Sequence, residues 1–172
     1  MRRALAFCLL WLTAAANAAP QTPGVAAFDY GYFCALDPVE EQASPDTVSG
    51  TVQLVADLPT FIARDLNVPA QVGVGFGVHV QTLPQFAGQV TVTSEHPPMG
   101  PNGVTRQSWV TDLSATEQNY VGYSFEYDYE LLPGLWTLSA QANGRMLYSI
   151  TFNILPPTQS PGVPCRQNIP LS

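Results

Sequence analysis

Three acidic residues, Glu126, Asp128 and Glu130, alternate with aromatic residues in the C-terminal half of the 172-residue chain. On a single β-strand their carboxylates would line one face at intervals of about 6.6 to 6.8 Å. Calcium needs about six to eight oxygen atoms that converge on one point, and a straight strand face does not converge. Asp112 and Glu117 in the preceding loop could complete a surface site, but a solvated face that protects a sheet edge is the favoured interpretation.

His96 and Met99, in the segment Glu-His-Pro-Pro-Met of residues 95–99, offer a second set of ligand groups. Imidazole and thioether both suit copper. Two ligands in one loop do not complete a site, and nothing in the sequence places His79, the other histidine, near them. We therefore expect no cofactor, and a calcium- or copper-binding protein built on these residues is the alternative function.

Residues for nucleophilic catalysis are harder to find. The sequence has no Gly-x-Ser-x-Gly motif and no histidine and aspartate whose positions suggest a pair. Composition alone leaves open a carboxylate pair for glycoside hydrolysis, but such enzymes usually need a larger scaffold with a deep cleft. The protein is therefore not expected to be an enzyme, and a small hydrolase is the least favoured alternative.

The N-terminus has the three parts of a secretory signal peptide. A Met-Arg-Arg start is followed by the uncharged, mostly apolar residues 4–16, and Ala-Asn-Ala at 16–18 fits the site that signal peptidase cleaves. The apolar run is shorter than the span of about 20 residues that crosses a membrane, so no stable membrane insertion is expected after cleavage behind Ala18. The protein is predicted to be periplasmic or secreted.

Of the three cysteines, Cys8 would leave with the signal peptide, and Cys34 and Cys165 would remain. An even pair in an exported chain predicts one disulfide. It would close a loop of about 130 residues, for which the loop-entropy model gives about 4 to 5 kcal/mol of stabilisation. Two free thiols or a metal pair are less favoured, because no third and fourth ligand stands at zinc spacing.

Composition excludes two broad classes of protein. Charged residues make up 11% of the chain and hydrophobic residues 46%, a balance that excludes a disordered chain. The formal charge is −7, and the chain from residue 19 would keep thirteen acidic residues and four of the six arginines, a charge of −9. Nucleic-acid binding is not expected, because phosphates need a basic surface.

Apolar and polar residues alternate with the period of a β-strand, and no long helical period competes. The alternating segments are residues 28–32, 48–56, 72–81, 90–93, 123–130, 136–142 and 146–154, with a weaker one at 104–111. Asn143-Gly144 between two of them predicts a tight hairpin turn, because both residues accept positive φ. We expect an all-β, antiparallel, immunoglobulin-like β-sandwich of about eight strands.

The predicted organisation is a signal peptide at 1–18, one β-sandwich domain at 19–155 and a proline-rich tail at 156–172 that the disulfide tethers. Within the domain, Gly73, Gly75 and Gly77 form a stripe on one face of a strand, with His79 on the same outer face. The stripe could admit a ligand, but the close approach of a large side chain from a neighbouring strand is the favoured explanation.

Two stretches of the sequence resemble a known bacterial family. They are residues 68–77 (VPAQVGVGFG) and residues 123–137 (YSFEYDYELLPGLWT), followed by a Gly-Arg-led final strand at 144–152. Over roughly residues 24–154 this pattern is similar to the domain of unknown function 3859 (DUF3859), a family of uncharacterised secreted β domains, with Tyr129 where that family often has Trp. The resemblance implies a fold, and no activity, ligand or catalytic residue.

Together these observations favour a non-catalytic, exported β-sandwich that binds an unknown protein or small ligand. Its binding site is expected on the aromatic-rich strands or on loops at one end of the domain.

Overall fold

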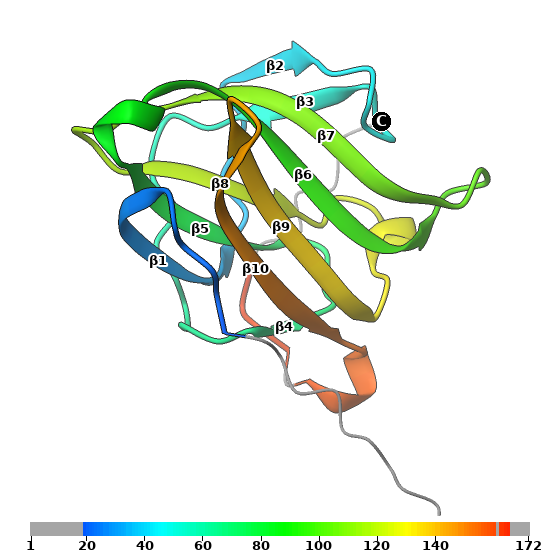
Figure 1. The fold of residues 1–172 in the computed structure, drawn as a ribbon. Coiled ribbons are helices and arrows are strands. Elements are labelled where there is room, and N and C mark those ends of the chain that lie inside the picture. The colour runs from blue at the N-terminus through cyan, green and yellow to red at the C-terminus, as the bar shows by residue number, and fades with distance from the viewer. Residues whose placement is uncertain (1–18, 161, 166–172) are drawn as a thin grey trace, which may run out of the picture.

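The structure is a computed structural model that describes residues 19–160 and 162–165. The predicted signal peptide, with its cleavage site at Ala18, and the end of the predicted tail lie outside these residues. The described residues fold into ten strands in three sheets, without an α-helix (Figure 1). Within this part of the chain, no helix has the length and hydropathy needed to cross a bilayer.

Two sheets form a sandwich, and a hairpin is added to one side. The three-stranded sheet has the order β1 (Val25–Cys34), β5 (Val74–Thr82), β8 (Asn119–Ser124). The five-stranded sheet has the order β4 (Asn67–Pro69), β10 (Arg145–Leu155), β9 (Gly134–Ala142), β6 (Gly88–Met99), β7 (Val104–Leu113). The hairpin is β2 (Glu40–Ala43) with β3 (Thr51–Leu54). All pairs are antiparallel except β4 with β10.

The expected immunoglobulin-like sandwich is confirmed, and two short strands were not expected. β2 carries the polar sequence Glu-Glu-Gln-Ala, and β4 has three residues that end in Pro69. Neither can show a strand period, because one is exposed throughout and the other is too short. Three short 3₁₀ turns complete the described fold: Pro84–Phe86, Asp128–Glu130 and Pro157–Gln159.

The core lies between the two large sheets and follows the alternation in the sequence. Apolar side chains of β5 face those of β9 and β10, and the buried set includes Val74, Phe76, Val78, Val80, Trp136, Leu138, Ile150 and Phe152. Phe76 is central, with its ring 4.9 Å from that of Phe152 and 5.7 Å from that of Trp136. Full burial of such side chains stabilises a fold by about 1.5 to 3 kcal/mol each. The predicted hairpin turn is also present, with φ of 51° at Asn143 and 72° at Gly144.

Two glycines of the predicted stripe, Gly75 and Gly77, lie in β5 and are explained by packing, as expected. The third, Gly73, precedes the strand and adopts a φ of 83°, so it does not belong to the stripe. A Cβ on Gly75 would lie 2.5 Å from the ring of Phe33, and one on Gly77 would lie 2.6 Å from the backbone of Gly122 and 3.1 Å from the ring of Tyr120. Aromatic rings from β1 and β8 therefore occupy the space above these glycines.

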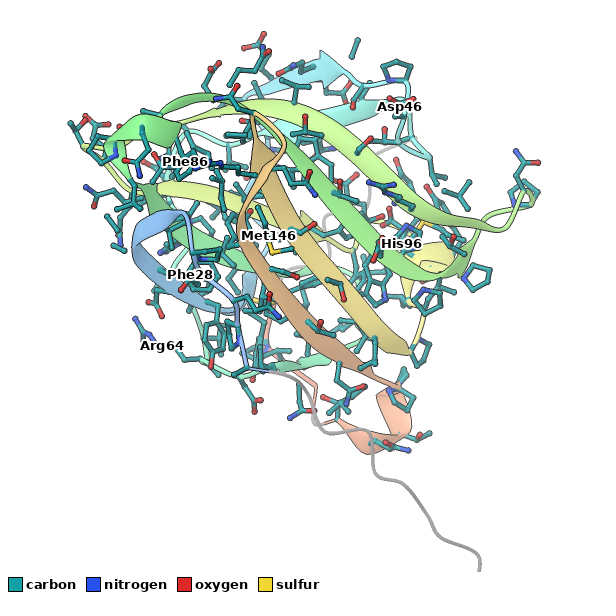
Figure 2. The ribbon with its side chains drawn as sticks, in the orientation of Figure 1. Phe28, Asp46, Arg64, Phe86, His96 and Met146 are labelled. Carbon is teal, nitrogen blue, oxygen red and sulfur yellow. A yellow bond between two sulfur atoms is a disulfide. The ribbon has the colours of Figure 1, made fainter. Side chains whose placement is uncertain are left out.

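One flank of the sandwich, where the edge strands β1 and β4 lie, is covered by the protein's own chain; we call it the closed flank. The backbone of Tyr32 in β1 donates to Ala63 at 3.1 Å and accepts from Ile62 at 2.8 Å. The predicted disulfide is present between Cys34, at the end of β1, and Cys165, with 5.1 Å between their Cα atoms. Arg64 pairs with Asp29 at 2.9 Å on the same side, where Figure 2 shows Arg64 below Phe28.

Candidate functional site

The predicted acidic strand face does not exist. β8 ends at Ser124, and residues 128–130 form a 3₁₀ turn, so Glu126, Asp128 and Glu130 do not line one strand. Glu130 is buried and draws the chain into this turn, because its Oε2 atom accepts the backbone N–H groups of Glu126 at 2.6 Å and Tyr127 at 2.9 Å. Its Oε1 atom accepts the Tyr123 hydroxyl at 2.8 Å. The interpretation of three solvated carboxylates was wrong because one of them serves as an internal acceptor.

Burial also sets the protonation of this acidic group. Burial raises the pKa of Glu130 above its ordinary value, although three hydrogen bonds oppose the shift. Burial raises the pKa of the half-buried Glu126 as well, and the nearby carboxylates of Glu130 and Glu41 add to the effect. Three carboxylates therefore interact at one place, and their mutual repulsion is unfavourable.

His96 and Met99 are both buried near the end of β6. Figure 2 labels His96. The Nδ1 atom of His96 lies 2.8 Å from the carbonyl oxygen of Pro97 and must donate to it, which leaves Nε2 as an acceptor. The side-chain amide of Gln107 donates to Nε2 at 2.9 Å. The imidazole also stacks on Trp136 at 4.6 Å, and burial lowers its pKa despite the contact with Pro97.

Three of the five candidate metal ligands, His96, Met99 and Glu130, thus lie close together. They are linked through hydrogen bonds of Gln107 and Tyr123. The Met99 sulfur lies 4.0 Å from the Gln107 amide and 3.9 Å from the Tyr123 hydroxyl, which in turn donates to Glu130. We call His96, Met99, Gln107, Tyr123 and Glu130 the buried network. Both imidazole nitrogens are engaged, and among the described residues no three His, Cys, Asp or Glu side chains are grouped to hold a metal.

Gln107 and Tyr123 were not anticipated as members of the network. Gln107 is a polar residue in β7 whose buried position the alternation does not mark, since its neighbours in the strand are also mostly polar. Its carbonyl oxygen accepts the backbone N–H of Val48 at 2.7 Å, which fastens the turn between β2 and β3 to the sandwich. This contact joins segments 59 residues apart, so no local sequence signal could reveal it.

Beside the buried network, a cavity of about 740 Å³ opens between β7, β8 and the β2–β3 hairpin. We call this side of the molecule the open flank. Figure 1 shows the hairpin next to β7, and Figure 2 shows Asp46 of the hairpin turn above His96. Three further contacts hold the hairpin in place. Ser108 N–H donates to Asp46 at 3.2 Å, the Ser44 hydroxyl donates to the Ser108 carbonyl at 3.4 Å, and Gln53 donates to Glu126 at 3.1 Å.

The lining of the cavity combines strand edges, aromatic rings and carboxylates. All of β8 borders it, and among the described strands β8 pairs only with β5 and β7 only with β6. Four aromatic and five acidic residues of the described chain line it, together with many amide and hydroxyl groups and no arginine or histidine. The aromatic and acidic residues are Trp109, Tyr120, Tyr123, Tyr127, Glu41, Asp57, Asp112, Glu126 and Glu130.

The family model for the Domain of unknown function (DUF3859) matches residues 21–154. The chain belongs to this family. The resemblance noted in the sequence is thereby confirmed, and the buried network, the cavity and Cys34 all lie within the matched residues of this DUF3859 domain. Cys165 lies beyond them.

The DUF3859 domain is similar in structure to an immunoglobulin-like protein from Pseudomonas aeruginosa, solved as a crystal structure. The TM-score is 0.53 at 20% sequence identity, and the match covers 82% of this chain and 100% of that one. The similarity shows the immunoglobulin-like fold. No protein of curated function matches the chain in sequence.

The other histidine of the DUF3859 domain has no visible functional role. His79 lies on the outer face of the three-stranded sheet, as expected, and its ring stacks on Phe61 at 4.3 Å. Burial lowers its pKa, and its Nε2 atom is buried without a hydrogen-bond partner. The residues around it, Asp29 and Arg64, pair with each other.

Proposed function

We propose that this protein is an exported, non-catalytic binding module and that the cavity of the open flank is its binding site. The observation that carries the proposal is the cavity itself, about 740 Å³ between two strand edges, with aromatic and polar groups along its wall. Ligand sites in proteins typically enclose about 300 to 1,000 Å³ and combine apolar surface with a few polar groups.

The side chains next to the cavity favour binding over catalysis. Glu130 accepts three hydrogen bonds from its own fold, and His96 uses both ring nitrogens within the buried network. Cys34 and Cys165 are bonded to each other. These groups therefore stabilise the structure, and a hydrolase or a calcium or copper site finds no support in their geometry.

Export is supported by two independent features of the chain. The N-terminal sequence has the basic start, apolar run and Ala-Asn-Ala exit of a signal peptide. A disulfide between strand β1 and the tail is typical of an oxidising compartment. Intact mass of the protein recovered from the periplasm or medium should correspond to a chain that begins at Ala19 and lacks two hydrogens.

The binding site can be tested in the cells that make the protein by photo-crosslinking. A photoreactive phenylalanine analogue is placed at Val110, an exposed β7 residue that lines the cavity, or at Met146, an equally exposed residue of β10 away from it. Irradiation is expected to give a discrete adduct from position 110 and none from position 146. Equal labelling at both positions, or no adduct at either, would overturn the proposal.

A further inference from the structure

The wall of the cavity carries charge of only one sign. Glu41, Asp57, Asp112 and Glu126 bring carboxylates to it, while none of the described arginines lines it. Glu126 is half buried and has the carboxylates of Glu41 and Glu130 close by. A cation that entered at this place would relieve repulsion within the folded protein, whereas an anion would increase it.

The cavity also borders the backbone of an edge strand, β8. β8 has six residues, Asn119–Ser124, and pairs with β5 on one side while its other side borders the cavity. An extended peptide can add to such an edge, with main-chain hydrogen bonds for affinity and every second side chain directed to one face. On the closed flank the equivalent groups of β1 already pair with Ile62 and Ala63.

An exposed aromatic pair stands next to the lining carboxylate of Glu126. Tyr127 lines it, and its ring stacks on that of Tyr129 at 5.4 Å with both residues 45% exposed. The face of an exposed tyrosine ring attracts an ammonium or guanidinium group. The same place therefore combines carboxylates, aromatic rings and an edge of backbone donors and acceptors.

We propose that the cavity binds an extended peptide segment of a partner protein that carries basic residues at alternating positions and adds to the free edge of β8. This inference rests on the proposed function and specifies its partner. Charge complementarity selects this occupant, since a second copy of the chain, with a charge of −9 from residue 19, would bring like charge to an acidic wall.

The test uses fluorescence anisotropy of labelled hexapeptides with the purified protein at low salt. The peptide Lys-Thr-Lys-Thr-Lys-Thr is expected to bind at least about tenfold more tightly than Gln-Thr-Gln-Thr-Gln-Thr, and the Glu-Thr peptide is not expected to bind. Because the charges are partly exposed, 0.5 M salt should weaken the lysine peptide severalfold. Spermidine, which has charge but no peptide backbone, should compete poorly.

Substitutions inside and outside the cavity test where the lysine peptide binds. Glu41→Gln with Glu126→Gln removes two carboxylates while keeping side-chain size, and should weaken the lysine peptide by about tenfold. Val110→Lys places a cation at the cavity and should act in the same direction. Met146→Lys adds the same charge to an exposed strand position outside the cavity and should leave affinity nearly unchanged.

The outcomes separate this inference from the proposed function. Equal affinity for the lysine and glutamine peptides would overturn the inference that the partner is a basic extended peptide. Competition by spermidine as strong as that by the lysine peptide would overturn it as well. So would absence of binding, or an equal effect of Val110→Lys and Met146→Lys. A crosslinked adduct specific to position 110 would still support the cavity as a binding site, with a partner of different chemistry.

Discussion

The two flanks of the sandwich differ in how their edge strands are covered. Each flank contains an edge strand of each of the two large sheets, and a strand edge left uncovered is open to pairing with other chains. On the closed flank, residues 61–66 run along β1 and lead into β4. The tail is held there by the disulfide and by two hydrogen bonds between Gln71 and Val163, at 2.8 and 3.0 Å. On the open flank, a hairpin attached by a few hydrogen bonds leaves a cavity over β7 and β8.

The closed flank is held by the protein's own chain, and the open flank is the place of the proposed binding site. Groups on the closed flank have partners from their own chain, so substitutions there should change the free energy of unfolding and leave binding unaffected. Groups on the open flank include crowded carboxylates and the unpaired edges of β7 and β8. If the proposed site is correct, substitutions there can raise stability while they lower affinity.

Removal of the disulfide tests the closed flank. Cys34→Ser with Cys165→Ser frees a loop whose ends are 131 residues apart, and unfolding free energy should fall by about 2 to 5 kcal/mol. Urea unfolding of the variant and of the oxidised parent measures the change. Affinity for the lysine peptide should be retained while the variant is folded. If reductant left the unfolding free energy of the parent protein unchanged, the disulfide-linked tail would not stabilise this flank.

Glu130→Ala tests the buried network at the floor of the open flank. The substitution leaves the Tyr123 hydroxyl and the N–H groups of Glu126 and Tyr127 without their acceptor. Loss of these bonds should cost about 2 to 4 kcal/mol of unfolding free energy. Asp128→Ala in the same turn is the control, because Asp128 is exposed, and should change stability by less than about 0.5 kcal/mol. Equal effects of the two substitutions would contradict the structural role assigned to Glu130.

Glu126→Gln should make the protein more stable. The raised pKa of Glu126 in the folded state means that its charged form disfavours folding, so this cost is present at neutral pH and disappears as the pH falls through that raised pKa toward the unfolded value. Glutamine removes the charge, and the gain should reach up to about 1 kcal/mol at pH 7 and vanish near pH 4.

Denaturant unfolding at both pH values measures this difference, with Glu117→Gln at an exposed loop position as the control. A loss of stability on Glu126→Gln at pH 7, or a gain of the same size at pH 4, would show that the open flank is not electrostatically strained.

Calcium and copper should not change the thermal stability of the protein. A metal at one hundred times its dissociation constant would add about 2.7 kcal/mol of stability. His96 has both ring nitrogens in hydrogen bonds and Glu130 accepts three. Among the described residues, the crowded carboxylates are not grouped in a way that could hold a metal ion. Thermal unfolding with and without each ion measures the shift. An increase in Tm that disappears in a His96→Gln variant would restore the metal-binding alternative.

The fold was predictable from the sequence wherever local signals agreed. The alternation in residues 72–81 marks the buried face of β5, and the Asn143-Gly144 turn has the positive φ that joins β9 to β10. The pairing of Cys34 with Cys165 followed from counting cysteines in a chain expected to be exported. Each of these features depends on residue types that favour one particular structure: alternating apolar residues a strand, Asn-Gly a hairpin turn, and a cysteine pair a disulfide.

The candidate site was less predictable because it depends on contacts between distant segments. The alternation of residues 123–130 continues past the end of β8, and only the burial of Glu130 reveals that the chain turns there. Gln107 meets Val48 and His96 through tertiary packing. The β2–β3 hairpin could not be placed over β7 and β8 from its polar sequence, so the cavity itself had no sequence signal.

The most direct test of the contrast between the flanks is an NMR titration of the ¹⁵N-labelled protein with the Lys-Thr-Lys-Thr-Lys-Thr peptide. The structure predicts that backbone amide shifts concentrate in Asn119–Ser124 of β8, in β7 and in the β2–β3 hairpin, while β1 and β4 are unchanged. Shifts centred on β1 and β4, or shifts spread evenly over both flanks, would contradict a binding site on the open flank.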